Sequence, residues 1–474
     1  MSTTSTTSTT KRAWYSPELH GVDHIPETER HGRSFDLLPL WFGLNAALFT
    51  VITGAIAGTV GLSFGWAATG LVIGAVLGAI PMAYHSAQGP KLGISQMIQS
   101  RAQFGFVGAI LPFVMALLIQ LGFLAATISL GAIALADFVP VSPQVGAVLI
   151  AALSLVFVIF GYRWIHSYAR VMVWAFGIVF AIITALLVFG HPLSGANYQA
   201  LNGSFQFGPF MLAVALSFIY VASYAPYCSD YSRYLPRNSS VAGTFIWTAL
   251  GVGITSAWLM PLGAYVDIIA NHPADINLAF GSISQSVGGW FRDVMFIVVV
   301  LSMGIQSTLN LYSSFLSMGS IYASVGRVKP SLSLRLSIIA PVFVIGTVGA
   351  FLFLANYLNT FELFLTLVLY AMIPWSAINL ADFYFVRKGR YSIGQMFEPN
   401  GIYGRVNLVG WGAYIIGLLV EAPFANVPGV YTGPVAKLLQ GGDISYFVAF
   451  PVIMVVYVAW ARTRPPVEPA DAST

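Results

Sequence analysis

Charged residues are scarce in this sequence: Asp, Glu, Lys and Arg together make up 8% of its 474 residues. Soluble domains carry about 25% charged residues, so the composition excludes an ordinary soluble domain. Hydrophobic residues make up 57% of the chain, and its mean hydropathy is +0.79. We therefore expect the chain to lie in a lipid bilayer.

Cysteine and the common catalytic motifs are also scarce. Cys228 is the single cysteine, which excludes an internal disulfide and a metal site built from paired thiols. The sequence contains no HExxH, Walker or GxSxG motif, so we expect neither an enzyme nor a cofactor. Segments outside the apolar stretches are too short to fold as signalling domains, which argues against the alternative of a substrate-sensing receptor.

Long apolar stretches are what the sequence does contain. Each is close to the roughly 20 residues that cross about 30 Å of hydrocarbon. All of the 21 Lys and Arg except Arg292 and Lys437 then fall on one side of the membrane. Basic residues favour the cytoplasmic side, so both ends of the chain are expected there. The twelve predicted spans are 36–61, 67–87, 106–137, 145–162, 168–190, 208–228, 241–268, 293–321, 333–354, 360–386, 407–423 and 444–461.

The spans divide the chain into four parts. We expect a cytoplasmic, largely disordered arm at 1–35, because the first residues are Ser and Thr in alternating runs. A core of ten spans follows at 36–390, and two further spans occupy 391–462. The tail, 463–474, is expected to be cytoplasmic.

Two spans carry helix-breaking residues at matching places. The first contains Gly43 and Asn45 near its middle, and the sixth contains Ser223 and Pro226. A single such residue more often marks a kink. A matched pair five spans apart instead favours two inverted repeats with a binding site at the midplane, because broken helices in a membrane must line a cavity or pack within protein.

The eighth span carries a cluster of small polar residues. Gly304, Ser307 and Thr308 share one helical face, and their oxygens suit a monovalent cation such as Na⁺. The alternative is that the hydroxyls bond their own helix or join two helices. Gln306, Asn310 and Ser313 occupy an adjacent face, and they are candidates for substrate contact because amides in a span need partners.

The third span carries an amide beside an aromatic ring. Gln120 and Phe123 are three residues apart, and Thr127 continues the same stripe. A planar heterocycle could stack on the ring and pair an edge with the amide. A lone Phe in a span more often faces lipid or the protein core.

At these residues the chain resembles the nucleobase:cation symporter-1 family, the purine–cytosine permeases. The resemblance covers about residues 20–462 and is carried by ERHGRSF and WFGLN near the N-terminus, GPKLGISQMIQSRAQFG, APYCSDYSRYLP and NLADFYFVRKGRY. It implies an all-α, twelve-span membrane protein with a five-plus-five inverted-repeat core of the leucine-transporter kind and two extra C-terminal helices.

The resemblance also implies positions for two sites. The cation ligands fall on Gly43 and Ala46 of the first span and on Gly304, Ser307 and Thr308 of the eighth. The substrate is expected between an aromatic of span 3 and one of span 6. These expected substrate contacts are Phe123, Gln120, Thr127, Tyr224 or alternatively Tyr220, and the amides of Asn45, Gln306 and Asn310.

The expected function is therefore import of a nucleobase or related planar heterocycle, with cytosine or a purine favoured, by cation symport across the cell membrane. Na⁺ is the expected coupling ion. The alternative is proton-coupled transport of allantoin, hydantoin, uracil or thiamine. We expect a monomer whose partners are the small substrate and the lipid bilayer, with no nucleic acid.

Overall fold

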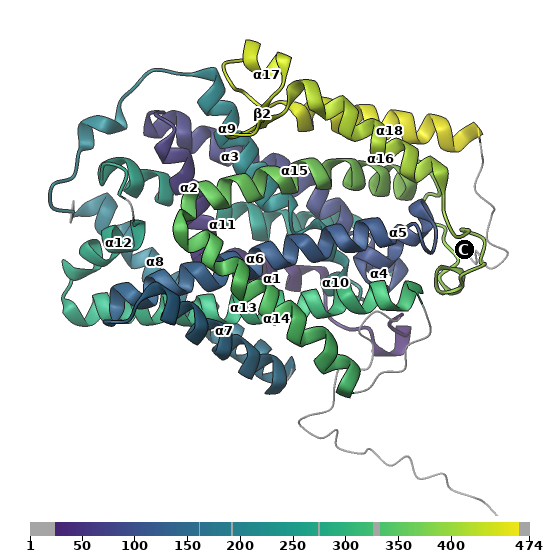
Figure 1. The fold of residues 1–474 in the computed structure, drawn as a ribbon, viewed down its shortest axis with the longest axis horizontal. Helices are drawn as coiled ribbons and strands as arrows, with labels where there is room; N and C mark the ends of the chain where they lie inside the picture. The colour runs from purple at the N-terminus through teal and green to yellow at the C-terminus, as the bar shows by residue number, and fades with distance from the viewer. Residues whose placement is uncertain (1–23, 161, 191–192, 274, 326–331, 464–474) are drawn as a thin grey trace, which may run out of the picture.

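The protein, described here by a computed structural model covering residues 24–160, 162–190, 193–273, 275–325 and 332–463, is built almost entirely of helices (Figure 1). The first half of the chain contains α1 (Leu37–Asn45), α2 (Leu48–Thr59), α3 (Phe64–Ser86), α4 (Gly89–Leu92), α5 (Gln96–Phe104), α6 (Ile110–Phe138), α7 (Pro143–Phe160), α8 (Tyr162–Phe189), α9 (Phe207–Ala222) and α10 (Cys228–Ser232). The second half contains α11 (Val241–Ile269), α12 (Ile276–Gln285), α13 (Gly289–Val325), α14 (Leu332–Ala355), α15 (Tyr357–Ala381), α16 (Leu408–Glu421), α17 (Pro434–Leu438) and α18 (Ser445–Thr463).

Short elements complete the fold. Two strands, β1 (Asn426–Val427) and β2 (Tyr431–Thr432), form an antiparallel hairpin. A five-residue π-helix, Asp382–Val386, continues from α15. Single 3-10 turns lie at Glu27–Glu29, Ser34–Asp36, Tyr198–Leu201, Ala225–Tyr227, Gly394–Phe397 and Ala422–Phe424.

Apolar helices account for all of the predicted spans. Among the described residues, nine helices are long and apolar enough to cross a membrane. The bent pair Ser34–Asn45 and Leu48–Thr59 adds a tenth span if it is counted as one, and Pro143–Val158 and Leu408–Phe424 are shorter apolar helices. Each predicted segment falls on one of these elements, whereas the count of twelve crossings stays a prediction.

The first and sixth predicted spans are interrupted, as their sequences indicated. The axes of α1 and α2 differ by 60°, and Ala47 between them is extended, with φ −143° and ψ 159°. The helix α9 ends at Ala222, and a single 3-10 turn separates it from α10. Both interruptions lie deep in the bundle, because Asn45, Ala46 and Ser223 are all buried.

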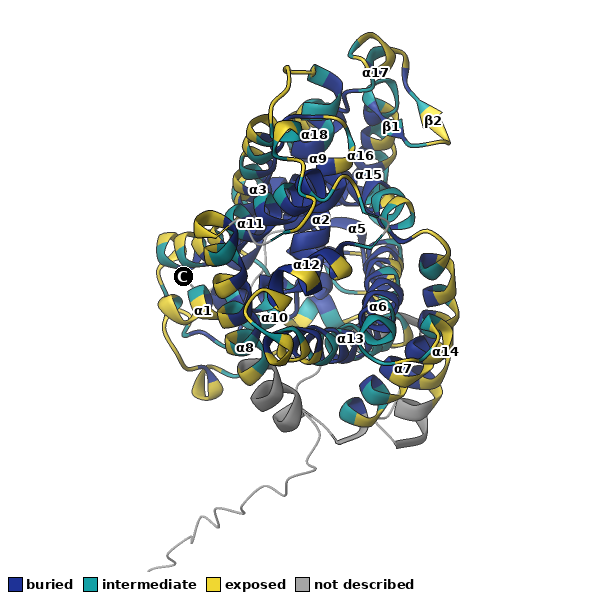
Figure 2. Cartoon of the chain, turned by 90° about the vertical axis from the view of Figure 1, so that its left-hand side faces the viewer, coloured by how far each residue is buried: buried dark blue, intermediate teal, exposed yellow. Residues whose placement is uncertain are grey.

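The helices are arranged so that their polar breaks are central and their apolar faces are peripheral. Buried residues fill the centre of the bundle, and exposed residues follow the outer sides of α7, α8 and α14 (Figure 2). Those outer sides are apolar: Leu149, Trp174 and Leu352 are between 50% and 70% exposed. In a bilayer this surface would face lipid. The last two apolar helices, α16 and α18, pack together and against α15 (Figure 1).

Several ordered segments were not foreseen from the sequence. The stretch between the second and third predicted spans forms α4 and α5, and all nine residues of α5 are buried although its composition is polar. Arg101 of α5 donates to the carbonyl of Met396 at 3.0 Å. The part of the N-terminal arm from residue 24 onward packs on this segment, with Arg30 donating to the carbonyl of Pro90 at 2.8 Å. Residues 1–23 and 464–474 lie outside the described residues.

Helix α11 approaches α2 closely enough to require glycine. A Cβ at Gly263 would overlap the carbonyl of Val51, and one at Gly54 would overlap the carbonyl of Met260. Small residues allow such backbone contact between helices in a membrane. Gly253 lies on the same helix as Gly263 but has no atom within 4 Å of its would-be Cβ.

We expect the substitution Gly263→Leu to destabilise the protein by at least about 3 kcal/mol, since overpacking costs about 1–3 kcal/mol even where the neighbours can move. Gly253→Leu is the matched control and should change stability by less than about 1 kcal/mol. The measurement is the apparent melting temperature of the detergent-purified protein. Equal losses in the two variants would refute the close α2–α11 contact.

Candidate functional site

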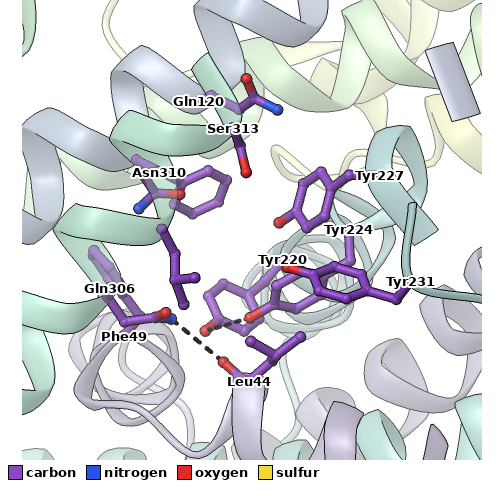
Figure 3. Close-up of a pocket in the computed structure, with 12 residues that line it drawn as sticks. Leu44, Phe49, Gln120, Tyr220, Tyr224, Tyr227, Tyr231, Gln306, Asn310 and Ser313 are labelled. Carbon is purple, nitrogen blue, oxygen red and sulfur yellow. Dashed lines mark hydrogen bonds between the residues drawn. The ribbon is translucent and has the colours of Figure 1, made fainter. Parts of the chain in front are cut away.

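A cavity lies between the two broken helices and the long helices α6 and α13 (Figure 3). The empty space among its side chains, including the part open to solvent, is about 530 Å³. The lining residues are Leu44, Phe49, Gln120, Phe123, Tyr220, Tyr224, Tyr227, Tyr231, Gln306, Leu309, Asn310 and Ser313.

The side of the cavity formed by α6 presents a ring and an amide. Phe123 makes edge-to-face contacts with Phe49 and Phe364, with ring centroids 6.0 and 5.1 Å apart. Gln120 accepts a hydrogen bond at Oε1 from the hydroxyl of Ser317 on α13, at 2.9 Å. With Oε1 engaged, the Nε2 group of Gln120 is left as a donor.

Four tyrosines form the opposite side of the cavity. Tyr220 lies near the end of α9, just before the break of the sixth span, and Tyr224 lies within the break. Both are more than 90% buried. The hydroxyl of Tyr220 bonds that of Thr50 at 2.9 Å. Tyr227 and Tyr231 extend the row beyond the break. Both candidate ring partners of the sixth span therefore line the cavity, and the choice between them stays a prediction.

Tyr227 and Tyr231 were missed in the sequence analysis, although a signal was present. Tyrosines at 220, 224, 227 and 231 are spaced four, three and four residues apart, which places them on one face of a helix. Phe49, Leu44 and Leu309 carried no such signal, because apolar residues are equally common on lipid-facing surfaces.

Asn45 and Thr127 contribute to structure rather than to the lining. The amide of Asn45 donates to the carbonyl of Val252 at 3.0 Å and to the hydroxyl of Ser256 at 2.8 Å, and its Oδ1 accepts from Tyr224 at 3.3 Å. The hydroxyl of Thr127 donates to carbonyls of its own helix. Their assignment to the substrate is a prediction that this geometry does not favour.

The hydroxyls of the candidate cation site are fully buried on α13. Ser307 donates to the carbonyl of Met303 and Thr308 to that of Gly304, each at 2.8 Å. These bonds use the hydroxyl hydrogens and leave oxygen lone pairs, which is the arrangement a cation requires. Gly304 faces α7, where Ser154 also approaches its carbonyl at 3.5 Å.

The other two candidate ligands, Gly43 and Ala46, lie at the break between α1 and α2. Ala46 directly follows the last residue of α1 as its C-cap, and Gly43 lies three residues earlier and packs against Val173 of α8. Between them, the carbonyl of Leu44 accepts a bond at 3.3 Å from Nε2 of Gln306 (Figure 3). That bond joins the break to the helical turn that carries Ser307 and Thr308.

Comparison with known proteins assigns the chain to a family. Residues 24–449 match the family described as permease for cytosine/purines, uracil, thiamine, allantoin. The chain belongs to this permease family. Its members are transporters rather than enzymes, which confirms the expectation that the protein is not an enzyme.

Individual relatives agree with the family. This permease is 37% identical over 448 residues to a Bacillus subtilis protein that carries the name "Putative purine-cytosine permease YxlA", covering 94% of this chain and 96% of the relative. It is 24% identical over 452 residues to the purine-cytosine permease of Emericella nidulans, covering 91% and 86%.

Solved structures agree on the fold. The inward-facing conformation of Mhp1 matches this permease with a TM-score of 0.75, covering 96% of this chain and 97% of the other. The closed form of Mhp1, described as a nucleobase-cation-symport-1 family transporter with bromovinylhydantoin bound, matches with a TM-score of 0.73 at 18% identity. The expected inverted-repeat helical fold is thereby confirmed.

We expect Asn45→Ala to destabilise the permease by about 2 kcal/mol or more. The substitution removes three hydrogen bonds in the protein interior, to the Val252 carbonyl and to the hydroxyls of Ser256 and Tyr224, and each such bond contributes about 0.5–1.5 kcal/mol. Asn310→Ala, an amide truncation on the cavity side of α13, should cost less. Thermal unfolding of the two purified variants compares them, and the reverse ranking would contradict the structural role of Asn45.

Proposed function

We propose that this permease is a secondary active transporter that imports a nucleobase or a related planar heterocycle by cation symport. The cavity supports this proposal, because its rings and neutral amides match a flat polar ligand. Among the described residues, those lining the cavity carry no charged side chain, which favours a neutral substrate. The purine-cytosine permeases among its relatives make cytosine or a purine the favoured substrate.

In the proposed bound state, the ring stacks between Phe123 and Tyr224, with Tyr220 as the alternative partner. The amide edge of the base pairs with Gln120, Gln306 and Asn310. Stacking of a base on an aromatic side chain contributes about 1–3 kcal/mol, so two rings suffice to hold a base in an uncharged site.

Na⁺ is the proposed coupling ion. The proposed ligands are the carbonyls of Gly43, Ala46 and Gly304 and the hydroxyls of Ser307 and Thr308. Neutral oxygen ligands suit Na⁺, and the buried hydroxyls already point their hydrogens away toward helix carbonyls.

Substrate and cation would be coupled through the broken first span. A cation bound to the break and to α13 favours the conformation in which the ring pocket is assembled, and the reciprocal effect of the substrate on cation affinity follows from linkage. One charge moving down 100 mV releases about 2.3 kcal/mol, which corresponds to about 50-fold accumulation of substrate.

We propose that the permease lies in the cell membrane as a monomer, with both termini in the cytoplasm. The core of ten spans at 36–390 would transport, and the spans within 391–462 would pack on its outside.

Replacing Ser307 and Thr308 together by Ala should abolish the Na⁺ dependence of cytosine or hypoxanthine uptake into proteoliposomes. The control is Ser314→Ala. Ser314 lies about two turns beyond Ser307 on α13, and its equally buried hydroxyl also donates to a carbonyl of its own helix. Unchanged Na⁺ dependence in the double variant would refute the cation site. Uptake driven by an imposed pH gradient without Na⁺ would instead support proton coupling.

Replacing Phe123 by Leu should weaken the binding of the base about tenfold, because loss of one stacking surface removes on the order of 1–3 kcal/mol. Tyr224→Leu should have a similar effect, whereas Tyr224→Phe retains the ring and should retain most of the affinity. Equilibrium binding of radiolabelled cytosine and hypoxanthine measures both. Full affinity in both leucine variants would exclude a stacked substrate at this level.

A further inference from the structure

A short helix, α12, covers one end of the bundle. It packs against α6, α8, α11 and α13, of which α6 and α13 line the cavity. In Figure 2, α12 lies in front of the centre of the bundle, and Figure 1 shows it at the opposite end from α4 and α5. Because α4 and α5 belong to the side that carries the basic residues, α12 belongs to the side that we propose faces the outside.

Two carboxyl groups meet where α12 begins. Asp275 is the N-cap of α12 and accepts a hydrogen bond at Oδ1 from the backbone amide of Asn277 at 2.8 Å. Its carboxyl also lies within hydrogen-bond reach of the carboxyl of Asp137, the second-to-last residue of α6. Oδ2 of Asp137 is buried, and no donor from the described residues reaches it. Two carboxylates have no hydrogen to share, so the two groups can bond each other only when one of them is protonated.

The neighbours of this pair favour one proton. The side chain of Asn277 is 3% exposed and lies beside both carboxyls, and its Nδ2 has no hydrogen-bond partner within the described ranges. Arg292, near the start of α13, lies close enough to Asp137 to attract its negative charge. One proton leaves the pair with a single negative charge, which the arginine balances. Two ionised carboxylates at this separation would instead repel each other.

The effect of pH follows from the burial of the pair. Burial raises the pKa of Asp275 above the ordinary value for an aspartate. The docked position therefore binds a proton more tightly than a carboxyl exposed to water. By linkage, lowering the pH favours the docked position of α12, and raising the pH through the raised pKa favours its separation from α6.

We propose that Asp137 and Asp275 form a proton-binding site that is reached from the outside, and that the bound proton holds α12 over the outer end of the bundle. Both residues are partly exposed, so the proton can leave to external water. The repulsion that remains then separates the start of α12 from α6 and uncovers the outer end of the cavity helices. A metal ion between the carboxylates is a different explanation, and the positive charge of Arg292 beside the pair disfavours it.

The test measures the distance between α12 and α7, which packs on α6. Spin labels would be attached in the variants Leu278→Cys and Val145→Cys, because these side chains are 52% and 50% exposed. The buried Cys228 would be replaced by Ala in the same protein. Double electron–electron resonance would be recorded on the full-length protein in lipid nanodiscs from about pH 5 to about pH 9, a range that brackets a raised aspartate pKa. Neither Na⁺ nor a base would be present.

We expect the distance in the parent protein to increase as the pH rises, by on the order of 5 Å, a common size for shifts of switching elements. Asp275→Asn and Asp137→Asn should each keep the short distance at every pH, because an amide donates to the remaining carboxylate without a titrating proton. Asn is also a good N-cap, so Asp275→Asn preserves the start of α12. The matched control is Asp293→Asn, which removes an exposed carboxylate at the start of α13 and should keep the response of the parent.

A distance in the parent that does not change with pH would overturn the proposal. A pH response that survives in both asparagine variants would do the same. A response that requires added Ca²⁺ and is lost with a chelator would show a metal site in place of the proton site. The measurement needs no substrate, so its result is independent of whether the protein transports a base.

Discussion

The structure depends on satisfying the backbone of a helix that stops in the middle of the membrane. An unbroken first span would give each carbonyl near residues 43–46 an amide partner four residues later. The break at Ala46 and Ala47 removes those partners where water is scarce, and each unsatisfied group costs several kcal/mol in hydrocarbon. The protein meets this requirement with one backbone amide and two side chains. The amide of Ala47 and the hydroxyl of Thr50 donate to the carbonyl of Asn45 at 2.9 and 2.5 Å, and Gln306 donates to that of Leu44 at 3.3 Å.

These substitute partners determine where the candidate sites lie. Asn45 ties the break to α11 and to Tyr224, so the first, sixth and seventh predicted spans are connected around one point. Gln306 ties the same break to α13. A cavity bounded by these connections has polar groups at fixed positions and rings between them, which is how small-molecule sites are usually built. The break is thus both a structural cost and the origin of the site.

The sequence predicts the helices well because their apolar length is required by the bilayer, and it predicts the breaks because Gly43, Ser223 and Pro226 are unusual within such stretches. Gln120, Phe123, Gln306 and Asn310 also lie along the cavity as the pattern of amides and rings indicated. Thr127 does not, because a hydroxyl on a helix can bond its own carbonyls and needs no other partner. The sequence did not predict the polar helix α5, since periodicity reports burial only when the buried face is apolar.

Gln306 shows how one side chain can connect the two candidate sites. A backbone carbonyl only accepts hydrogen bonds, so the amide must turn its Nε2 toward Leu44, and Oε1 remains as its acceptor. Leu44 lies between the two proposed cation ligands of the break, and Gln306 directly precedes Ser307 on α13. Any shift of the break on cation binding therefore changes the position of an amide that lines the cavity. Coupling between two sites requires an element whose arrangement both ligands bias. This hydrogen bond joins the break to α13 beside both the candidate cation site and the cavity.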